Sequence, residues 1–314
     1  MADFEHLIQD AVATHDIPGC ALVSTNRDGT FHYAKAFGST SMKEANASPF
    51  ALNTIMWIAS CTKLMTSLCC MQLVERRLIT LDEPVYTHIP ELRSFNVLKG
   101  FEEDSGKPIE EPHRKDITLR LLLTHASGLA YDGMSASSLA WLKWHGREPS
   151  TSGKLLERFN GPLMFEPGES WAYGPGIDYA GLLVERVTGK SLEEYMRENL
   201  WERLGVRDIT FFPSSRPDLK GKMADMSVRD ESGKVRFTGA RMSYQDAEGK
   251  EASDCMGGQG TFTSAEEYVK VLKAVLTCDE DEKILTKGSI EEFFRPQLGQ
   301  GSKRTLNEFL QDDM

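Results

Sequence analysis

A serine and a lysine three positions apart, Ser60 and Lys63, stand where a long helical segment begins. Positions i and i+3 of a helix share one face, so the hydroxyl and the amine would lie side by side. A serine on a first helical turn also lies near unpaired backbone N–H groups and the positive end of the helix dipole. About one or two such pairs are expected by chance in a chain with this many serines. Support for a nucleophile therefore has to come from the rest of the chain.

Apolar residues follow the pair at helical spacing and predict a helix over residues 60–77. They are Leu64, Leu68, Met71, Val74 and Leu78. A turn signal at 26–29 between two strand-like runs predicts a β-hairpin over 20–25 and 31–36. Further helices are predicted over 3–14, over a short leucine run between Thr118 as N-cap and Gly128 as stop, over 139–160, over 178–188 ended by Gly189, over 191–204, and over 264–276.

Composition excludes several classes of protein. The 314 residues are 40% hydrophobic and 26% charged, with a net charge of −11, which disfavours nucleic acid and anionic membranes as partners. No apolar run approaches the ~20 residues of a membrane span. The N-terminus has no basic region followed by an apolar stretch, so a cytoplasmic protein is predicted. The six cysteines show no C-x-x-C spacing, which indicates reduced thiols.

Two more stretches follow the Ser60–Lys63 pair along the chain. Residues 122–129 read Leu-Leu-Thr-His-Ala-Ser-Gly-Leu, and residues 165–173 read Phe-Glu-Pro-Gly-Glu-Ser-Trp-Ala-Tyr. In this order the three stretches resemble the serine β-lactamase/penicillin-binding-protein superfamily, on its class C-like and esterase branch. The resemblance covers nearly the whole chain. The charged stretch 93–116 and the run after Tyr173 are similar to fungal transesterases of the lovastatin acyltransferase type.

This resemblance implies an α+β, β-lactamase/transpeptidase-like fold, with an antiparallel sheet flanked by helices and a mostly helical subdomain. Residues 1–314 would form one domain, with 1–60 and 255–314 on the sheet side and 61–254 in the helical subdomain. By the same resemblance, about 80 residues would be missing at the C-terminus, including strands that pair with a hairpin that is only marginally stable alone.

The residue types suit covalent acyl transfer. Ser60 would be the nucleophile, and Lys63 would take its proton when neutral, a form that burial or a nearby positive group favours. Tyr173 would relay a proton from Ser60 and later to the leaving group. The backbone N–H of Ser60 would supply half of an oxyanion hole. No metal or organic cofactor is required, and Trp171 and Gly258 are predicted to contact substrate.

Other interpretations of these residues stay open. Taken alone, Ser60 could be an N-cap beside a solvated Lys63, and Tyr173 could be a core aromatic. His125 suggests a serine–histidine pair, but the resemblance implies a structural role for it. None of the seven histidines has metal-ligand spacing such as H-E-x-x-H. The glycine-rich turn at 257–260 lacks the lysine of a phosphate-binding loop and is explained by a tight turn.

Two departures from the family pattern bear on the substrate. Class C members usually carry an asparagine two positions after the tyrosine, where this chain has Pro175. A proline has no polar side chain to hold a lactam amide, so ester or thioester substrates are favoured. The late strand of the family, which bears Lys-Thr-Gly or His-x-Gly, has no convincing equivalent, because Lys303-Arg304-Thr305 lies in an unsuitable context.

The predicted function is serine-dependent acyl transfer through an acyl-Ser60 intermediate, from a thioester or ester to an alcohol of a secondary metabolite. The donor could be a small molecule or a carrier-protein or polyketide-synthase thioester. Carboxylester hydrolysis and β-lactam hydrolysis are alternatives within the same fold. An alternative of another class is a truncated, catalytically impaired homologue that acts as a binding protein.

Overall fold

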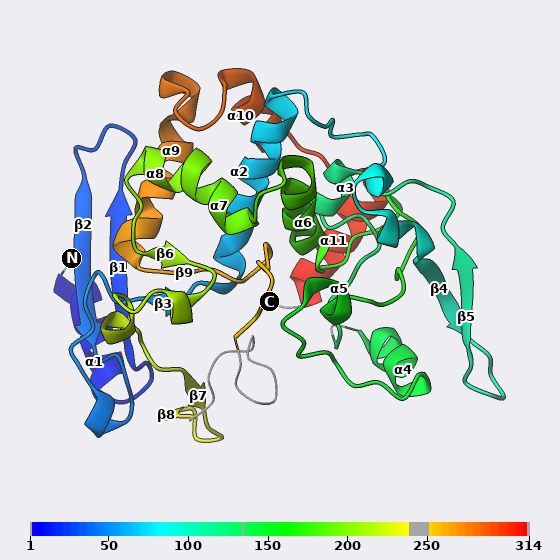
Figure 1. Ribbon diagram of the computed structural model, residues 1–314. Helices are drawn as coiled ribbons and strands as arrows, with labels where there is room; N and C mark the ends of the chain where they lie inside the picture. Colours follow the sequence, from blue (N-terminus) through cyan, green and yellow to red (C-terminus); the bar gives the residue numbers. More distant parts are fainter. Residues whose placement is uncertain (1, 134, 239–250, 313–314) are drawn as a thin grey trace.

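The computed structural model describes residues 2–133, 135–238 and 251–312 and shows an α+β architecture (Figure 1). Its α-helices are α1 (Ala2–Ala13), α2 (Thr62–Glu75), α3 (Leu119–Leu123), α4 (Ala136–Trp144), α5 (Leu155–Arg158), α6 (Gly176–Thr188), α7 (Leu192–Met196), α8 (Glu202–Leu204), α9 (Ala265–Asp281), α10 (Lys287–Phe294) and α11 (Gln300–Asp312). Its strands are β1 (Gly19–Thr25), β2 (His32–Gly38), β3 (Met56–Trp57), β4 (Asn96–Phe101), β5 (Pro108–Pro112), β6 (Ile209–Thr210), β7 (Ser227–Arg229), β8 (Val235–Phe237) and β9 (Phe262–Thr263). Short 3₁₀ turns are η1 (Glu44–Asn46), η2 (Ala59–Cys61), η3 (Val85–Thr87), η4 (Pro90–Ser94), η6 (Pro213–Ser215) and η7 (Lys220–Lys222), and η5 (Arg197–Trp201) is a π-helical turn.

The described strands form small antiparallel sheets. β1 pairs with β2, β4 with β5 and β7 with β8, while β9 lies between β3 and β6. The predicted N-terminal hairpin is confirmed, and its register runs from Gly19 opposite Gly38 to Thr25 opposite His32. Gly38 has a φ of 79°, and a Cβ there would lie 2.5 Å from the Pro18 carbonyl oxygen. The open end of this hairpin, away from its turn, therefore requires a glycine.

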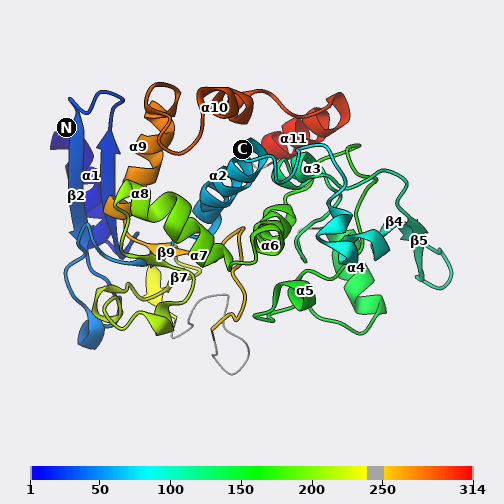
Figure 2. The same ribbon diagram turned by 45° about the horizontal axis from the view of Figure 1, so that its top comes forward.

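Helix α2 runs through the centre of the molecule (Figures 1 and 2). The β1–β2 hairpin and α9 lie on one side of it, and α3 to α6 lie on the other. It packs against α6, α7 and α10, and its Leu68, Cys69 and Leu73 are 0% exposed. Burying a side chain of this size contributes about 1.5–3 kcal/mol. This packing fixes the position of α2 and of the residues at its N-terminus.

Several predicted helix ends are confirmed. Thr118 caps α3 through its side chain, which accepts from the Leu121 N–H. Ser191 and Glu194 form a complete capping box at the start of α7. Gly189 ends α6 with a φ of 71°. In each case the local sequence and the packing favour the same boundary.

Three boundaries differ from the predictions. Helix α3 ends at Leu123 rather than at Gly128, because His125 takes the left-handed conformation first, with a φ of 58°. The helix predicted over 139–160 is two helices, α4 and α5, separated by a segment that contains Pro149. Leu78 lies beyond the end of α2 and is 50% exposed.

The remaining predictions on architecture have mixed outcomes. The charged stretch 93–116 forms the β4–β5 hairpin. Lys303, Arg304 and Thr305 lie in α11, and among the described residues no strand follows β9. The division into a sheet side and a helical subdomain stays a prediction, and residues 239–250 of it lie outside the described part.

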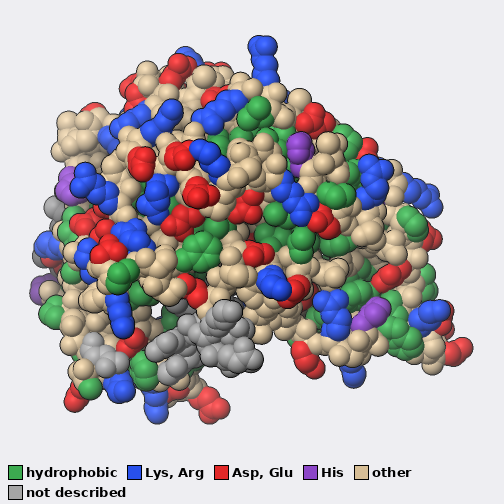
Figure 3. Space-filling model, viewed as in Figure 1, with side chains coloured by type: hydrophobic (Ala, Val, Ile, Leu, Met, Phe, Trp, Pro, Cys, Tyr) green, Lys and Arg blue, Asp and Glu red, His purple; other side chains and the backbone are tan. Residues whose placement is uncertain are grey.

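The surface is mixed in charge. Acidic and basic side chains alternate over the face shown in Figure 3, without a large area of one sign. Within the described ranges, no helix is long and apolar enough to cross a membrane.

Candidate active site

Ser60 lies on a tight turn between β3 and α2. The 3₁₀ turn η2 contains it and leads directly into α2. Ala59 has a φ of 44°, a left-handed conformation that residues other than glycine seldom adopt. The Tyr268 hydroxyl, on α9, donates to the Cys61 carbonyl at 2.9 Å. The turn is thereby tied to α9 and leaves Ser60 exposed at the N-terminus of α2.

The side chains of Ser60, Lys63 and Tyr173 meet at this turn. The Ser60 and Tyr173 hydroxyl oxygens are 2.5 Å apart, and either hydroxyl can donate. The Lys63 Nζ donates to Ser60 Oγ at 3.1 Å and lies 4.6 Å from the centre of the Tyr173 ring. The structure therefore brings together the three residues that the sequence predicts as catalytic, from segments 113 positions apart.

Lys63 is buried beneath Ser60, with 9% of its surface exposed. Its Nζ also donates to the Gly258 carbonyl at 2.7 Å and to the Tyr131 hydroxyl at 3.3 Å. An ammonium carries three hydrogens, whereas a neutral amine carries two and a lone pair. Of its three neighbours, Ser60 is the one whose proton a lysine lone pair would take in acyl transfer.

A buried acid lies behind this lysine. Asp178, on α6, is 0% exposed, and its carboxylate accepts from the Tyr131 hydroxyl at 2.9 Å and from the Gly258 N–H at 2.8 Å. Burial raises the pKa of the Asp178 carboxyl, while the charge of Lys63 and these two hydrogen bonds act in the opposite direction. Asp178 and Tyr131 are not among the site residues predicted from the sequence. An acid inside the otherwise apolar start of α6 is the signal that could have found Asp178.

His125 lies behind Tyr173 and not beside Ser60. Its ring centre is 4.8 Å from that of Tyr173, and its Nδ1 accepts from the Gly174 N–H at 3.3 Å. Burial, together with the smaller effect of the positive charge of Lys63, lowers the pKa of His125 to about 4. A neutral imidazole that accepts from the backbone supports the Tyr173 ring.

Trp171 and helix α11 extend the site on one side. The Trp171 ring centre lies 6.4 Å from that of Tyr173 and 5.2 Å from that of Phe309, on α11. The Ser302 hydroxyl, also on α11, donates to the Ser170 carbonyl at 2.8 Å. Helix α11 thus supports the segment that carries Tyr173. A substrate contact by the half-buried Trp171 stays a prediction.

Gly258 occupies a place where no side chain fits. A Cβ there would lie 2.3 Å from the nearer Asp178 carboxylate oxygen. Its N–H and carbonyl are both engaged, with Asp178 and Lys63. The structure thus shows Gly258 holding Lys63, while its predicted contact with substrate stays a prediction.

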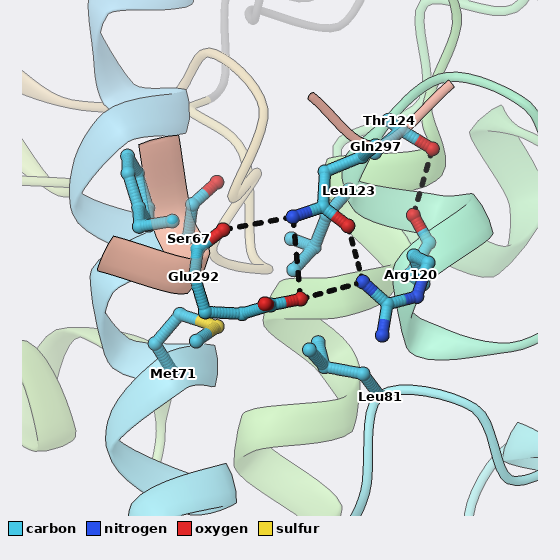
Figure 4. A pocket seen from close by; sticks show the side chains of 9 residues that line it. Ser67, Met71, Leu81, Arg120, Leu123, Thr124, Glu292 and Gln297 are labelled. Atoms are coloured by element: carbon cyan, nitrogen blue, oxygen red, sulfur yellow. Dashed lines mark hydrogen bonds and ion pairs between the residues drawn. The ribbon is translucent and has the colours of Figure 1, made fainter. Parts of the chain in front are cut away.

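A cavity of about 230 Å³ lies further along α2 (Figure 4). Ser67 and Met71 line it from α2, and Glu292, Gln297 and Arg120 line its polar side. Since a helix rises 1.5 Å per residue, Ser67 and Met71 lie roughly 10–16 Å along the axis from Ser60. This cavity is therefore separate from the cluster at Ser60. The residues that the structure describes include no group of three or more His, Cys, Asp or Glu placed to hold a metal ion.

The fold and the serine–lysine–tyrosine cluster at a helix N-terminus define a β-lactamase/transpeptidase-like protein. Residues 4–307 match the family model described as Beta-lactamase, and the chain belongs to this family.

Fungal enzymes are similar to nearly the whole chain. The lovastatin esterase of Penicillium rubens is 34% identical over 292 residues, which are 93% of this chain and 72% of that protein. The monacolin J acid methylbutanoyltransferase of Aspergillus terreus is 33% identical over 98% of this chain and 73% of that protein. A mutant of the simvastatin synthase LovD from Aspergillus terreus matches with a TM-score of 0.86 and 36% identity, over 97% of this chain and 71% of that chain. The chain is shorter than each of these relatives.

Proposed function

We propose that this protein transfers a short acyl group to an alcohol through an acyl-Ser60 intermediate. The observation that carries the proposal is the contact of Ser60 Oγ with both Lys63 Nζ and Tyr173 Oη at the N-terminus of α2. Relatives named as a methylbutanoyltransferase and an esterase support acyl chemistry. The donor would be a thioester or ester, free or on a carrier protein, and the acceptor an alcohol of a secondary metabolite.

Acylation uses the proton acceptors around Ser60. Its Oγ attacks the donor carbonyl carbon while neutral Lys63 takes its proton, directly or through Tyr173. The backbone N–H of Ser60 donates to the oxyanion that forms, an interaction typically worth about 3–4 kcal/mol. The bond from the carbonyl carbon to the leaving sulfur or oxygen then breaks, and Tyr173 returns the proton to the departing group.

Deacylation repeats these steps with the acceptor. The alcohol gives its proton to Tyr173 or Lys63 and attacks the acyl-Ser60 carbonyl, and the proton returns to Ser60 as the new ester leaves. If water attacks instead, the products are a carboxylic acid and free enzyme. Carboxylester hydrolysis is therefore the second candidate function, and the lovastatin esterase supports it.

Mass spectrometry of the intact protein tests the nucleophile. After incubation with a short acyl thioester, we expect one acyl adduct, mapped to Ser60. Ser60→Ala should give none, whereas Ser67→Ala, two helical turns further along on α2, is the matched control and should give the adduct. An adduct that persists in Ser60→Ala, or its absence from the wild-type protein, would contradict acyl transfer through Ser60.

The fate of the adduct separates the remaining functions. Transfer of the acyl group to an added alcohol supports the transferase. Loss of the acyl group to water at the same rate with and without the alcohol supports the esterase. A protein that only binds would form no adduct. Nitrocefin turnover would support β-lactam hydrolysis, which we do not expect, because Pro175 offers no side-chain donor for a lactam amide.

A further inference from the structure

Four groups form a closed ring of hydrogen bonds beneath Ser60. Lys63 Nζ donates to the Gly258 carbonyl at 2.7 Å and to the Tyr131 hydroxyl at 3.3 Å. The Tyr131 hydroxyl donates to Asp178 Oδ2 at 2.9 Å, and the Gly258 N–H donates to Asp178 Oδ1 at 2.8 Å. Asp178 does not contact Ser60 in this ring and is 0% exposed. Its carboxylate therefore makes hydrogen bonds to the site only through these two partners.

The acid fixes the direction of the hydrogen bond between Tyr131 and Lys63. A carboxylate accepts hydrogen bonds and donates none. Because the Tyr131 hydroxyl gives its single proton to Asp178, it can offer Lys63 only a lone pair. Tyr131 must then accept from Lys63 and cannot donate to it.

The acid also holds the second acceptor in place. Gly258 packs so closely on Asp178 that a Cβ would lie 2.3 Å from the carboxylate. With its N–H held by Asp178, the carbonyl of the same residue faces Lys63. A neutral amine has two hydrogens, and these two acceptors take both. The lone pair is left for the remaining neighbour, Ser60 Oγ.

We propose that Asp178 is a positioning residue that aims the Lys63 lone pair at Ser60 by fixing the direction of the hydrogen bonds from Tyr131 and Gly258. The proposal rests on the acyl transfer through Ser60 proposed above. Asp178→Asn tests it with almost no change of shape. An amide has one acceptor oxygen for two donors, so its NH₂ group must face either Tyr131 or Gly258. If the NH₂ group faces Tyr131, it donates to the Tyr131 hydroxyl oxygen. The proton of that hydroxyl must then point toward the lone pair of Lys63.

The measurement is the rate at which a fluorophosphonate probe labels Ser60, followed from pH 5 to pH 10. We expect Asp178→Asn to slow labelling by about 100-fold, the scale of a misaligned reacting group. A merely structural role is separated from this one by the double variant below, because removal of the Tyr131 hydroxyl would not restore labelling to a site that is only distorted.

A second variant keeps the test decisive. Tyr131→Phe retains the ring and removes the hydroxyl, and it should label more slowly than wild type. The double variant Asp178→Asn/Tyr131→Phe should label at least as fast as Asp178→Asn, because no reversed hydroxyl remains to occupy the lone pair. Asp132→Asn removes a partly buried acid outside the ring and is the matched control, expected to stay within about threefold of wild type.

The outcomes separate this inference from the proposed function. If wild type and Asp178→Asn are labelled at equal rates at every pH, the role of Asp178 is overturned. The proposal of acyl transfer through Ser60 is not affected by that outcome. If Asp178→Asn does not fold, a Tyr131→Phe variant that matches wild type at every pH overturns it equally. Wild-type protein that is not labelled at Ser60 overturns both.

Discussion

His125 occupies a left-handed backbone position, with a φ of 58°, between α3 and the segment that carries Tyr173. Its carbonyl accepts from the Ala172 N–H at 3.1 Å, and its Nδ1 accepts from the Gly174 N–H at 3.3 Å. One residue thus holds the backbone on both sides of Tyr173. A protonated imidazole would lose the second of these bonds, because Nδ1 would then be a donor.

We expect this histidine to make the protein sensitive to mild acid. Its pKa falls from 6.5 to about 4 on folding, so the unfolded chain binds the proton first as the pH falls. The stabilisation is fully present above pH 6.5 and is lost progressively toward pH 4, by at most about 1.4 kcal/mol per pH unit. Urea unfolding at pH 7 and pH 4.5 measures this loss.

His125→Asn is the control for that measurement. Asparagine tolerates the left-handed conformation, and its Oδ1 can accept from the Gly174 N–H without titrating. We expect it to lose about 2 kcal/mol less between the two pH values than the wild-type protein. Equal losses in the two proteins would show that His125 does not govern the acid sensitivity.

At the scale of residues, the sequence predicts the reacting groups better than the groups that hold them. Ser60, Lys63 and Tyr173 carry side chains whose chemistry and spacing can be read directly, and the structure brings them together. Asp178 and Tyr131 act through hydrogen bonds across long sequence separations, up to 80 positions between Asp178 and Gly258. Such contacts depend on the packing of α6 against α2, which no local pattern specifies.

Arg120 joins several elements at the cavity beside α2. Its guanidinium donates to both oxygens of Asp82 at 2.7 Å. It also donates to Glu292, on α10, at 2.8 Å and to Gln297 (Figure 4). Arg120 and Glu292 are 22% and 25% exposed, so solvent screens the contact only in part. This side chain therefore connects α3 to α10 and to the loop that follows it.

We expect Arg120→Met to lower the free energy of unfolding by about 1–3 kcal/mol, between the values for exposed and buried ion pairs. Lys154→Met is the control, because its ion pair with Glu157 is 63% and 58% exposed. That change should have a smaller effect than Arg120→Met, because solvent screens an exposed ion pair. Chemical denaturation measures both, and equal effects would mean that Arg120 adds no more than a surface pair.

At the scale of elements, local signals predict caps well and helix length less well. The capping residues Thr118, Ser191 and Gly189 act within one turn, so their effect can be read from neighbouring positions. The helix predicted over 139–160 divides into α4 and α5 because a proline and two glycines interrupt it.

The whole molecule carries a net charge of −11. Both signs are interspersed on the face in Figure 3, so on that face the charge acts as a diffuse field and not as a patch. Such a field repels an acidic protein at a distance and hardly affects a small neutral thioester. The screening length falls from about 30 Å at 0.01 M salt to about 8 Å at 0.15 M.

We therefore expect salt to distinguish two kinds of acyl donor. With an acyl group on an acidic carrier protein, kcat/KM should rise several-fold between 0.01 and about 0.15 M salt, because repulsion slows the encounter at low salt. With a neutral small thioester it should stay within about twofold. A rate with the carrier-bound donor that falls as salt is added would instead indicate a local basic docking surface.

The support that α11 gives to Trp171 also orders events while the chain is being made. Translation adds about 5–20 residues per second, so Ser60 and Lys63 leave the ribosome roughly 10–50 seconds before Phe309 does. During that interval the lysine lacks the Gly258 carbonyl for most of the time, and the Tyr173 segment lacks its packing partner on α11. Under the proposed acyl transfer, we therefore expect a nascent chain to carry its serine in an inert form until Gly258 and Phe309 have both been synthesised.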